Sequence, residues 1–388
     1  MSGGRIVFSD RQLDFRGAVR WFLRESRFCR PVGSRCAQRP WHQFWRDAGR
    51  LGILGIGVPE SLGGLADSDF RHSVIVTEEI QALGLDLAGL RIQADMCLPL
   101  LLNHGSPDQR AHWLPRLASG RSTMALGLSE PATGCTVSAM STTARRCGDR
   151  YIVNGRKTFV PNGDPADAVI VAVRTGHRGS TGASLLIVDA DTPGFAYHDA
   201  HGRASALGEH MGAMSFTDME VPVSSILGVE GQALGYLAAN LAQERLSAAV
   251  KCQAAAAAVV SWTVDLHRDV GLGPNAQRVL ARCDADIAAG QGLVDEALRR
   301  HVNTEFTAVE AARLKKSSAD LQSRVISCCV RLCDPSIGLS GWHRPQRTPG
   351  RSRAVRRADL QKSPTSPPNV GVLPADRRCF GVSNTGPG

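Results

Sequence analysis

Two short segments of the sequence hold residue types suited to contact with a flat or anionic ligand. The first, Ala125–Thr136 (ALGLSEPATGCT), begins apolar, breaks at Pro131 and continues through small residues. It cannot form the interior of a helix, because proline lacks an N–H and pushes the preceding residue out of the α region. Its backbone amides and small hydroxyls can therefore lie against such a ligand. The second segment, Gly155–Gly163 (GRKTFVPNG), is predicted to be a hydrophobic turn between two glycines.

A third candidate is the carboxylate of Glu244, which lies in a long helix-like stretch without proline. Its neighbours Leu241 and Leu246 are apolar, which predicts partial burial. Burial disfavours the charged form of a carboxylate and makes it a stronger base, as proton abstraction requires. The alternative is a solvated glutamate on a helix surface, paired with Lys251 or Arg245.

Composition and the distribution of charge argue against a nucleic-acid-binding function. The 388 residues are 43% hydrophobic and 21% charged, as in soluble globular proteins of two or three domains. The net charge of +9 comes largely from residues 342–378, where nine Lys or Arg face two Asp and supply +7. This tail has few aromatic residues and no RNA-binding motif beside it, so a nucleic-acid-binding role is not expected.

The cysteines and the apolar runs give the expected compartment. The eleven cysteines include no CxxC pair, so no metal site is predicted. Their odd number fits free thiols in a reducing compartment. The N-terminus resembles no signal peptide, and no apolar run approaches the ~20 residues of a membrane span. A cytoplasmic protein without a membrane span is expected.

The elements that must position these candidates fall into three regions and a tail, which predicts an α+β multidomain fold. Residues 1–123 are predicted to be an all-α domain, with Ser9 capping its first helix and Ser106 its last. A helix at 87–104 should be kinked or interrupted at Pro99. Residues 124–228 are predicted to be a β-barrel-like domain, because strand-like runs bounded by Gly, Asn and Asp recur there. Asn154-Gly155 is the signature of a hairpin turn.

Residues 229–333 are predicted to be a C-terminal helical bundle. Three long, Ala-rich helices at about 234–270, 275–301 and 306–332 amount to most of a four-helix bundle. After Leu332 the helical periodicity stops. Residues 334–388 are a basic, Pro- and Arg-rich tail that is predicted to be disordered, which leaves the bundle incomplete.

The order α, β, α, with LSEPATGC opening the β region, resembles the acyl-CoA dehydrogenase family. The resemblance extends over residues 9–333. Further blocks match the family in the same order: Gly55–Glu60 with Gly63-Gly64, His112–Gly120, Asp218–Pro222 and Gly228–Gly231.

The resemblance implies an FAD-dependent enzyme that introduces a double bond between the α and β carbons of an acyl-CoA. In the family a glutamate removes the α proton while a hydride leaves the β carbon for flavin N5. An electron-transferring flavoprotein then accepts the electrons. The acyl group would come from fatty-acid or steroid side-chain catabolism, and a homodimer or homotetramer is expected.

The resemblance also assigns roles to residues. The base is expected on the long helix, as in long-chain and isovaleryl-CoA dehydrogenases, in the triplet Glu244-Arg245-Leu246, which makes Glu244 the catalytic residue. Substrate contacts are expected at Cys135 and Arg245. The residues expected to bind FAD are Leu126, Leu128, Ser129, Cys135, Phe159, Val160, Pro161 and Arg268.

Three departures from the family pattern favour an alternative, a degenerate, catalytically weak or inactive member that binds flavin weakly or not at all and has an interaction role or none. Pro161 replaces a hydroxyl residue that hydrogen-bonds flavin, and loss of one such donor costs roughly 2–4 kcal/mol. The loop after Arg268 is short. The Gly-rich turn expected after Leu332 is replaced by an Arg- and Pro-rich run, which is typical of a shifted reading frame. Resequencing the gene tests that hypothesis.

Overall fold

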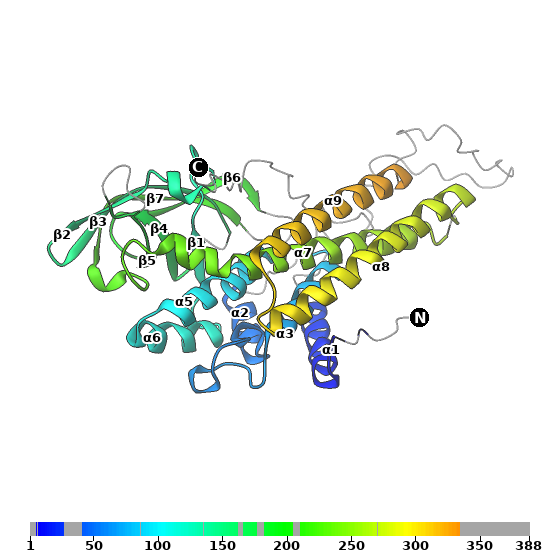
Figure 1. Ribbon diagram of the computed structural model, residues 1–388, viewed down its shortest axis with the longest axis horizontal. Helices are drawn as coiled ribbons and strands as arrows, with labels where there is room; N and C mark the ends of the chain where they lie inside the picture. The colour runs from blue at the N-terminus through cyan, green and yellow to red at the C-terminus, as the bar shows by residue number, and fades with distance from the viewer. Residues whose placement is uncertain are drawn as a thin grey trace, which may run out of the picture.

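The structure is a computed structural model that describes residues 5, 7–26, 41–85, 87–134, 136–161, 166–176, 182–204, 210–269 and 271–333. Helices, then strands, then helices follow one another, with the change of element type at Met124 and again at Ala233. Figure 1 shows the N-terminal helices along the lower side of both the sheet and the three long helices, which extend to one side. The α+β multidomain fold is confirmed. The tail at 334–388 lies outside the described residues. Its predicted disorder and the predicted incompleteness of the bundle therefore stay predictions.

The N-terminal region is helical, as predicted. Ser9 caps the first helix and Ser106 the last, each through a reciprocal pair of bonds with a glutamine three residues later. The helices are α1 (Asp10–Glu25), α2 (Trp41–Arg50), α3 (Phe70–Ala82), α4 (Ala88–Ile92), α5 (Leu98–His104) and α6 (Pro107–Ala118), with short 3-10 turns η2 (Ile53–Gly55) and η3 (Glu60–Leu62).

The predicted interruption near Pro99 is a π turn, η4 (Gln93–Cys97), between α4 and α5. Pro99 has no N–H to donate to the carbonyl oxygen of Asp95, four residues earlier. That oxygen instead accepts bonds from Asn240 Nδ2 at 2.9 Å and Gln243 Nε2 at 3.3 Å. The break in one helix therefore creates a docking point for another.

The described strands form one curled sheet of seven strands, in the order β1-β4-β2-β3-β7-β6, with β5 paired to β4. β1 pairs with β4 in parallel, whereas β3, β7 and β6 pair antiparallel. The strands are β1 (Met124–Gly127), β2 (Thr143–Cys147), β3 (Arg150–Pro161), β4 (Ala168–Arg174), β5 (Ala183–Asp189), β6 (Phe195–Ala204) and β7 (His210–Pro222).

The predicted hairpin turn at Asn154-Gly155 is wrong. Both residues lie inside β3, where the pairing with β7 shifts register between Val153 and Gly155. A Cβ at Gly155 would lie 2.6 Å from Thr142 Cα, so this glycine permits β3 and the segment at Thr142 to approach closely. The predicted turn at Gly155–Gly163 is likewise strand as far as Pro161. Gly163 lies outside the described residues.

The C-terminal region consists of α7 (Ala233–Leu266), α8 (Pro274–Val302) and α9 (Ala308–Cys333). At 34 residues, α7 is about 50 Å long, and it packs against α9, α8, α3, η4 and β5. It thus links all three regions. Among the helices described, none is long and apolar enough to cross a membrane. Nor do the described residues include a group of three or more His, Cys, Asp or Glu placed to hold a metal.

Candidate functional site

Helix α7 holds Glu244 against α9. Glu244 Oε1 accepts a hydrogen bond from Lys315 Nζ at 2.8 Å, and the glutamate side chain is 28% exposed. The predicted partial burial is therefore confirmed, and the recorded ion partner is Lys315 rather than Lys251 or Arg245. Glu244 Oε2 is buried and has no hydrogen-bond partner in the described part of the chain. One oxygen is held in place while the other keeps its lone pairs.

A small cavity adjoins Gln243, the residue before Glu244. Its volume is about 200 Å³, and it lies between η4 with its flanking helices and the start of α3. Leu98, Leu102 and Phe70 supply apolar surface, and Asp95 with Ser73 supplies a polar part. Asp95 is buried and accepts bonds from Ser73 Oγ and from Arg91. The cavity is thus mixed in character, and a second carboxylate, Asp69, also lines it. Both carboxylates are paired with arginines, Asp69 with Arg71 and Asp95 with Arg91.

The segment after β1 folds into a tight loop, and the prediction that it is not helical is confirmed. Glu130 and Gly134 exchange two backbone hydrogen bonds of 2.9 and 2.8 Å, with Gly134 at φ 56°. Thr133 Oγ1 is buried and has no partner among the residues described. Leu126 and Leu128 pack toward the hydrophobic core, and Ser129 lies half-buried beside them. Cys135 lies outside the described residues.

The end of β3 lies beside this loop, because Thr158 N donates to Ser129 O at 2.9 Å. Phe159 has a φ of 53°, unusual for a residue with a side chain, and its ring is 65% exposed. Val160 is fully buried in the sheet core, and Pro161 is buried too. Of these predicted flavin contacts, only Phe159 presents its side chain at the surface.

A buried ion pair beneath the loop escaped the sequence analysis. Lys157 and Glu130 are 0% and 1% exposed, and Lys157 Nζ lies 2.9 Å from Glu130 Oε1. Burial alone would raise the pKa of Glu130, but hydrogen bonds from Ser141, Thr142 and Lys157 outweigh it and lower the pKa to about 2. Burial lowers the pKa of Lys157. The available signal was a single acid in the first ligand-like segment and the adjacent bases Arg156 and Lys157 in the second.

The two predicted arginines lie elsewhere. Arg245 is buried, and its Nη1 donates to Ala308 O at the start of α9, which gives it a structural contact rather than an open substrate contact. Arg268 follows the end of α7, is 76% exposed and pairs with Asp265 at 2.5 Å. Arg268 is 24 positions beyond Glu244 and therefore lies about 35 Å from it along the helix direction. The structure does not bring them together within one chain.

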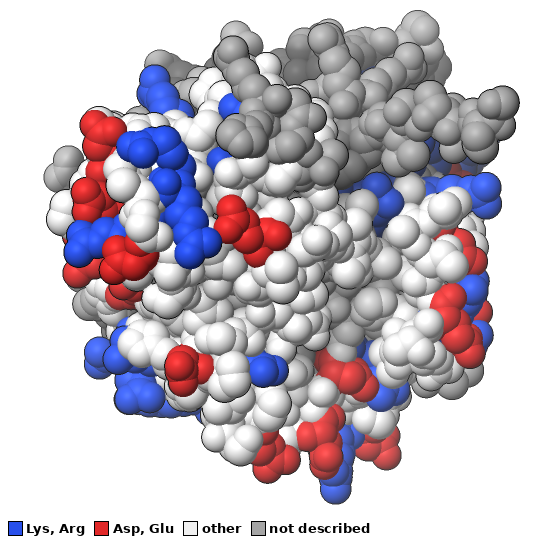
Figure 2. Space-filling model, turned by 60° about the vertical axis from the view of Figure 1, so that its left-hand side comes forward, with Lys and Arg blue, Asp and Glu red and all other residues white. Residues whose placement is uncertain are grey.

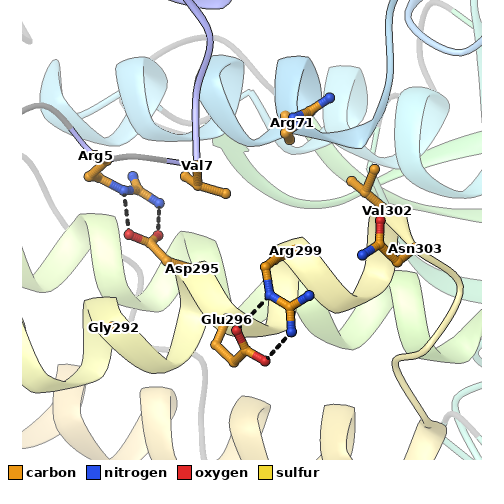
Figure 3. Close-up of a pocket in the computed structure, with 9 residues that line it drawn as sticks. All are labelled: Arg5, Val7, Arg71, Gly292, Asp295, Glu296, Arg299, Val302 and Asn303. Atoms are coloured by element: carbon orange, nitrogen blue, oxygen red, sulfur yellow. Dashed lines mark hydrogen bonds and ion pairs between the residues drawn. The ribbon is translucent and has the colours of Figure 1, made fainter.

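A larger cavity of about 620 Å³ lies between α8 and the start of α3 (Figure 3). Four of its charges pair with one another, Arg5 with Asp295 and Arg299 with Glu296 (Figure 3), while Arg71 pairs with Asp69 outside the lining. None of the predicted site residues is among the described residues that line it. On the face in Figure 2, acidic and basic side chains are intermixed around a broad uncharged area.

Comparison with known proteins agrees with this arrangement. The family model for the acyl-CoA dehydrogenase N-terminal domain matches residues 9–121, and that for the middle domain matches residues 125–219. The long-chain specific mitochondrial acyl-CoA dehydrogenase of Sus scrofa is 28% identical over 340 residues, 85% of this chain and 79% of that protein. An acyl-CoA dehydrogenase of Bacillus subtilis is 31% identical over 293 residues, 74% of this chain and 72% of its own length.

Solved structures show the same fold. The crystal structure of acyl-CoA dehydrogenase from Geobacillus kaustophilus superposes with a TM-score of 0.77 at 30% identity, covering 84% of this chain and 88% of that one. The two domain models together match more than half of the chain, in the region that holds the loop, the sheet and the buried ion pair. The chain is therefore a member of the acyl-CoA dehydrogenase family, whose enzymes are oxidoreductases.

Proposed function

We propose that this protein dehydrogenates an acyl-CoA thioester between its α and β carbons, with Glu244 as the base. The observation on which this rests is the state of the Glu244 carboxylate. Lys315 holds Oε1, while Oε2 is buried and unpartnered among the residues described. A carboxylate oxygen shielded from water and with free lone pairs is suited to accept a proton from carbon.

The family is FAD-dependent, and several residues of this chain fit that cofactor. Thr133 Oγ1 is a buried polar atom without a partner in the described chain, and Phe159 presents an exposed ring at a strained φ. An aromatic ring can stack on a flat ring system, and the hydroxyl can bond its edge. When bound, FAD supplies the acceptor for the hydride that leaves the β carbon. Leu128, Ser129 and Phe159 would hold it.

The cavity beside Gln243 would take the acyl chain. Leu98, Leu102 and Phe70 give it an apolar side, and its volume of about 200 Å³ favours a short or slender acyl group. Fatty acyl and steroid side-chain thioesters are the substrate classes to compare. The long-chain enzyme of Sus scrofa is named for its substrates, whereas this cavity is small. Electrons would pass to an electron-transferring flavoprotein, as in the family.

The test is anaerobic reduction of the FAD-loaded protein by a panel of acyl-CoA thioesters of increasing length. We expect bleaching of the flavin absorbance by at least one substrate. Glu244→Gln should retain the absorbance but bleach at least ~100-fold more slowly, because general-base catalysis contributes roughly 10²–10⁴-fold. Glu296→Gln, an exposed carboxylate on α8, is the matched control and should bleach as the wild type does. Unchanged bleaching in Glu244→Gln would place the base elsewhere.

A degenerate, catalytically weak member is the second candidate, and Pro161 favours it. Proline offers neither a hydroxyl nor an N–H at a position where the family donates to flavin. Pro161→Thr restores both. If the wild type binds FAD but reduces it slowly, this variant should bleach at least ~10-fold faster. Pro222→Thr, at the opposite end of the β3–β7 ladder, is the control for introducing the same N–H and hydroxyl away from the flavin site.

A further inference from the structure

We propose that Lys157 and Glu130 are positioning residues for the flavin, because their buried ion pair fixes the two flavin-contacting segments relative to one another. The inference rests on the proposed function, since it concerns the same site. Both side chains are buried, at 0% and 1% exposure. Neither can therefore touch a ligand at the surface of the loop. Their effect must be transmitted through the backbone that they hold.

Lys157 joins β3 to the first segment at two points. Its Nζ donates to Glu130 Oε1 at 2.9 Å and to the carbonyl oxygen of Leu128 at 3.2 Å. Leu128 and Ser129 are the residues expected to contact flavin from this side. From the same strand, Thr158 N donates to Ser129 O. Lys157 and Thr158, the two residues before Phe159, are thus both hydrogen-bonded to the loop.

Glu130 in turn closes the loop that it begins. Its two carboxylate oxygens accept four bonds from the backbone N–H and hydroxyl groups of Ser141 and Thr142, at 2.6 to 2.9 Å. With Lys157 it has five donors in all, so its lone pairs are fully used. A carboxylate in this state is a fixed anchor and has no capacity left to act as a base. It holds the start of the loop at Glu130 against Ser141 and Thr142.

Two glycines leave the space that this ion pair and its partners occupy. A Cβ at Gly127 would lie 3.3 Å from Lys157 Cγ, so the lysine stem crosses β1 where that strand has no side chain. Thr142, which bonds Glu130, lies so close to β3 that only a glycine fits at position 155. The two glycines and the two charged residues therefore form one arrangement that sets the spacing between β1, the loop and β3.

The consequence concerns Phe159. Its φ of 53° is costly for a residue with a side chain and persists only where the surrounding structure enforces it. The enforcing contacts on its N-terminal side are those of Lys157 and Thr158 with the loop. Loss of the lysine charge would leave the Glu130 carboxylate buried without its cation. The loop would then move away from β3, and the Phe159 ring would lose its position against the flavin.

The experiment compares FAD binding and the visible flavin spectrum in the full-length wild type and in Lys157→Met, with circular dichroism to verify folding. We expect Lys157→Met to bind FAD about tenfold more weakly or worse, equivalent to about 1.4 kcal/mol, and to show an altered flavin band shape. Glu130→Gln keeps the shape of the anchor and removes its charge. It should give the same change, and it provides the comparison if Lys157→Met does not fold.

The matched control is Val153→Ala, a fully buried residue on β3 that lies away from the loop. It should lower the melting temperature while leaving FAD affinity within about threefold and the flavin spectrum unchanged. The inference is overturned if both charge variants bind FAD with wild-type affinity and spectrum, or if Val153→Ala weakens binding as much as they do. If the wild type itself binds no FAD, the proposed function fails, and the inference fails with it.

Discussion

At the scale of single residues, the site depends on how one carboxylate is held. Lys315 bonds only Oε1 of Glu244, which fixes the plane of the carboxylate and directs Oε2 inward. Both side chains are about 30% exposed, so the pair adds little stability, on the order of 0–1 kcal/mol. Its value therefore lies in orientation, and a change at Lys315 should affect catalysis more than folding.

We predict that Lys315→Met lowers kcat by at least ~10-fold, because a poorly oriented base loses the near-attack geometry that proximity provides. The melting temperature should fall by no more than a few degrees. Stopped-flow flavin reduction and a thermal melt measure the two effects. Lys316→Met is the neighbouring control, since Lys316 is 77% exposed and pairs with Asp320 instead. Equal losses in both variants would argue against an orienting role.

Glu130 gives the fold a dependence on acid. Its pKa is about 2 in the folded chain against an ordinary value of 4.5. Because the folded-state pKa is the lower one, ionised Glu130 stabilises the fold fully above pH 4.5, and this stabilisation is lost as the pH falls toward 2. We predict that the free energy of unfolding falls more steeply below pH 4.5 in the wild type than in Glu130→Gln. Urea titrations at several pH values test this, with Glu220→Gln on β7 as an exposed control.

At the scale of elements, local signals predicted most helices correctly and one strand wrongly. Ser9 and Ser106 cap the helices expected of them, since capping depends only on residues within one turn. Asn154-Gly155 has the composition of a hairpin turn but lies inside β3, because Thr142 approaches the strand there. That approach brings together two segments that lie apart in the sequence, so no local sequence pattern indicates it. The Glu130–Lys157 pair escaped prediction for the same reason.

The π turn before Pro99 shows how one element prepares the docking of another. Because Pro99 has no N–H, it cannot donate to the Asp95 carbonyl oxygen, and Asn240 of α7 donates to that oxygen instead. We predict that Asn240→Leu destabilises the protein by about 1 kcal/mol, since Gln243 still bonds the same oxygen. In the Pro99→Ala background the cost should shrink, because the new N–H can bond Asp95 within the helix. A double-mutant cycle by urea unfolding measures this coupling, and strict additivity would refute it.

At the scale of the whole molecule, α7 connects the site to a distant end of the protein. Val264 and Leu266, near the end of this helix, are 43% and 37% exposed, and Val330 on α9 is 50% exposed. Arg268 follows them and is 76% exposed. It lies too far from Glu244 to serve the same site within one chain. If Arg268 contacts flavin phosphates, as the family resemblance implies, the flavin must belong to a second copy.

This arrangement predicts that FAD drives self-association. A ligand held by two copies binds the assembled form more tightly, so adding it must shift the equilibrium toward the dimer. In sedimentation velocity, the wild type should move toward dimer or larger species as FAD is added. Arg268→Gln should show a smaller shift and weaker FAD binding, because a cation beside the phosphates is lost. Arg299→Gln on α8, whose charge is engaged by Glu296, is the control and should behave as the wild type does. A monomer that binds FAD with unchanged affinity at every protein concentration would show that each chain holds its flavin alone.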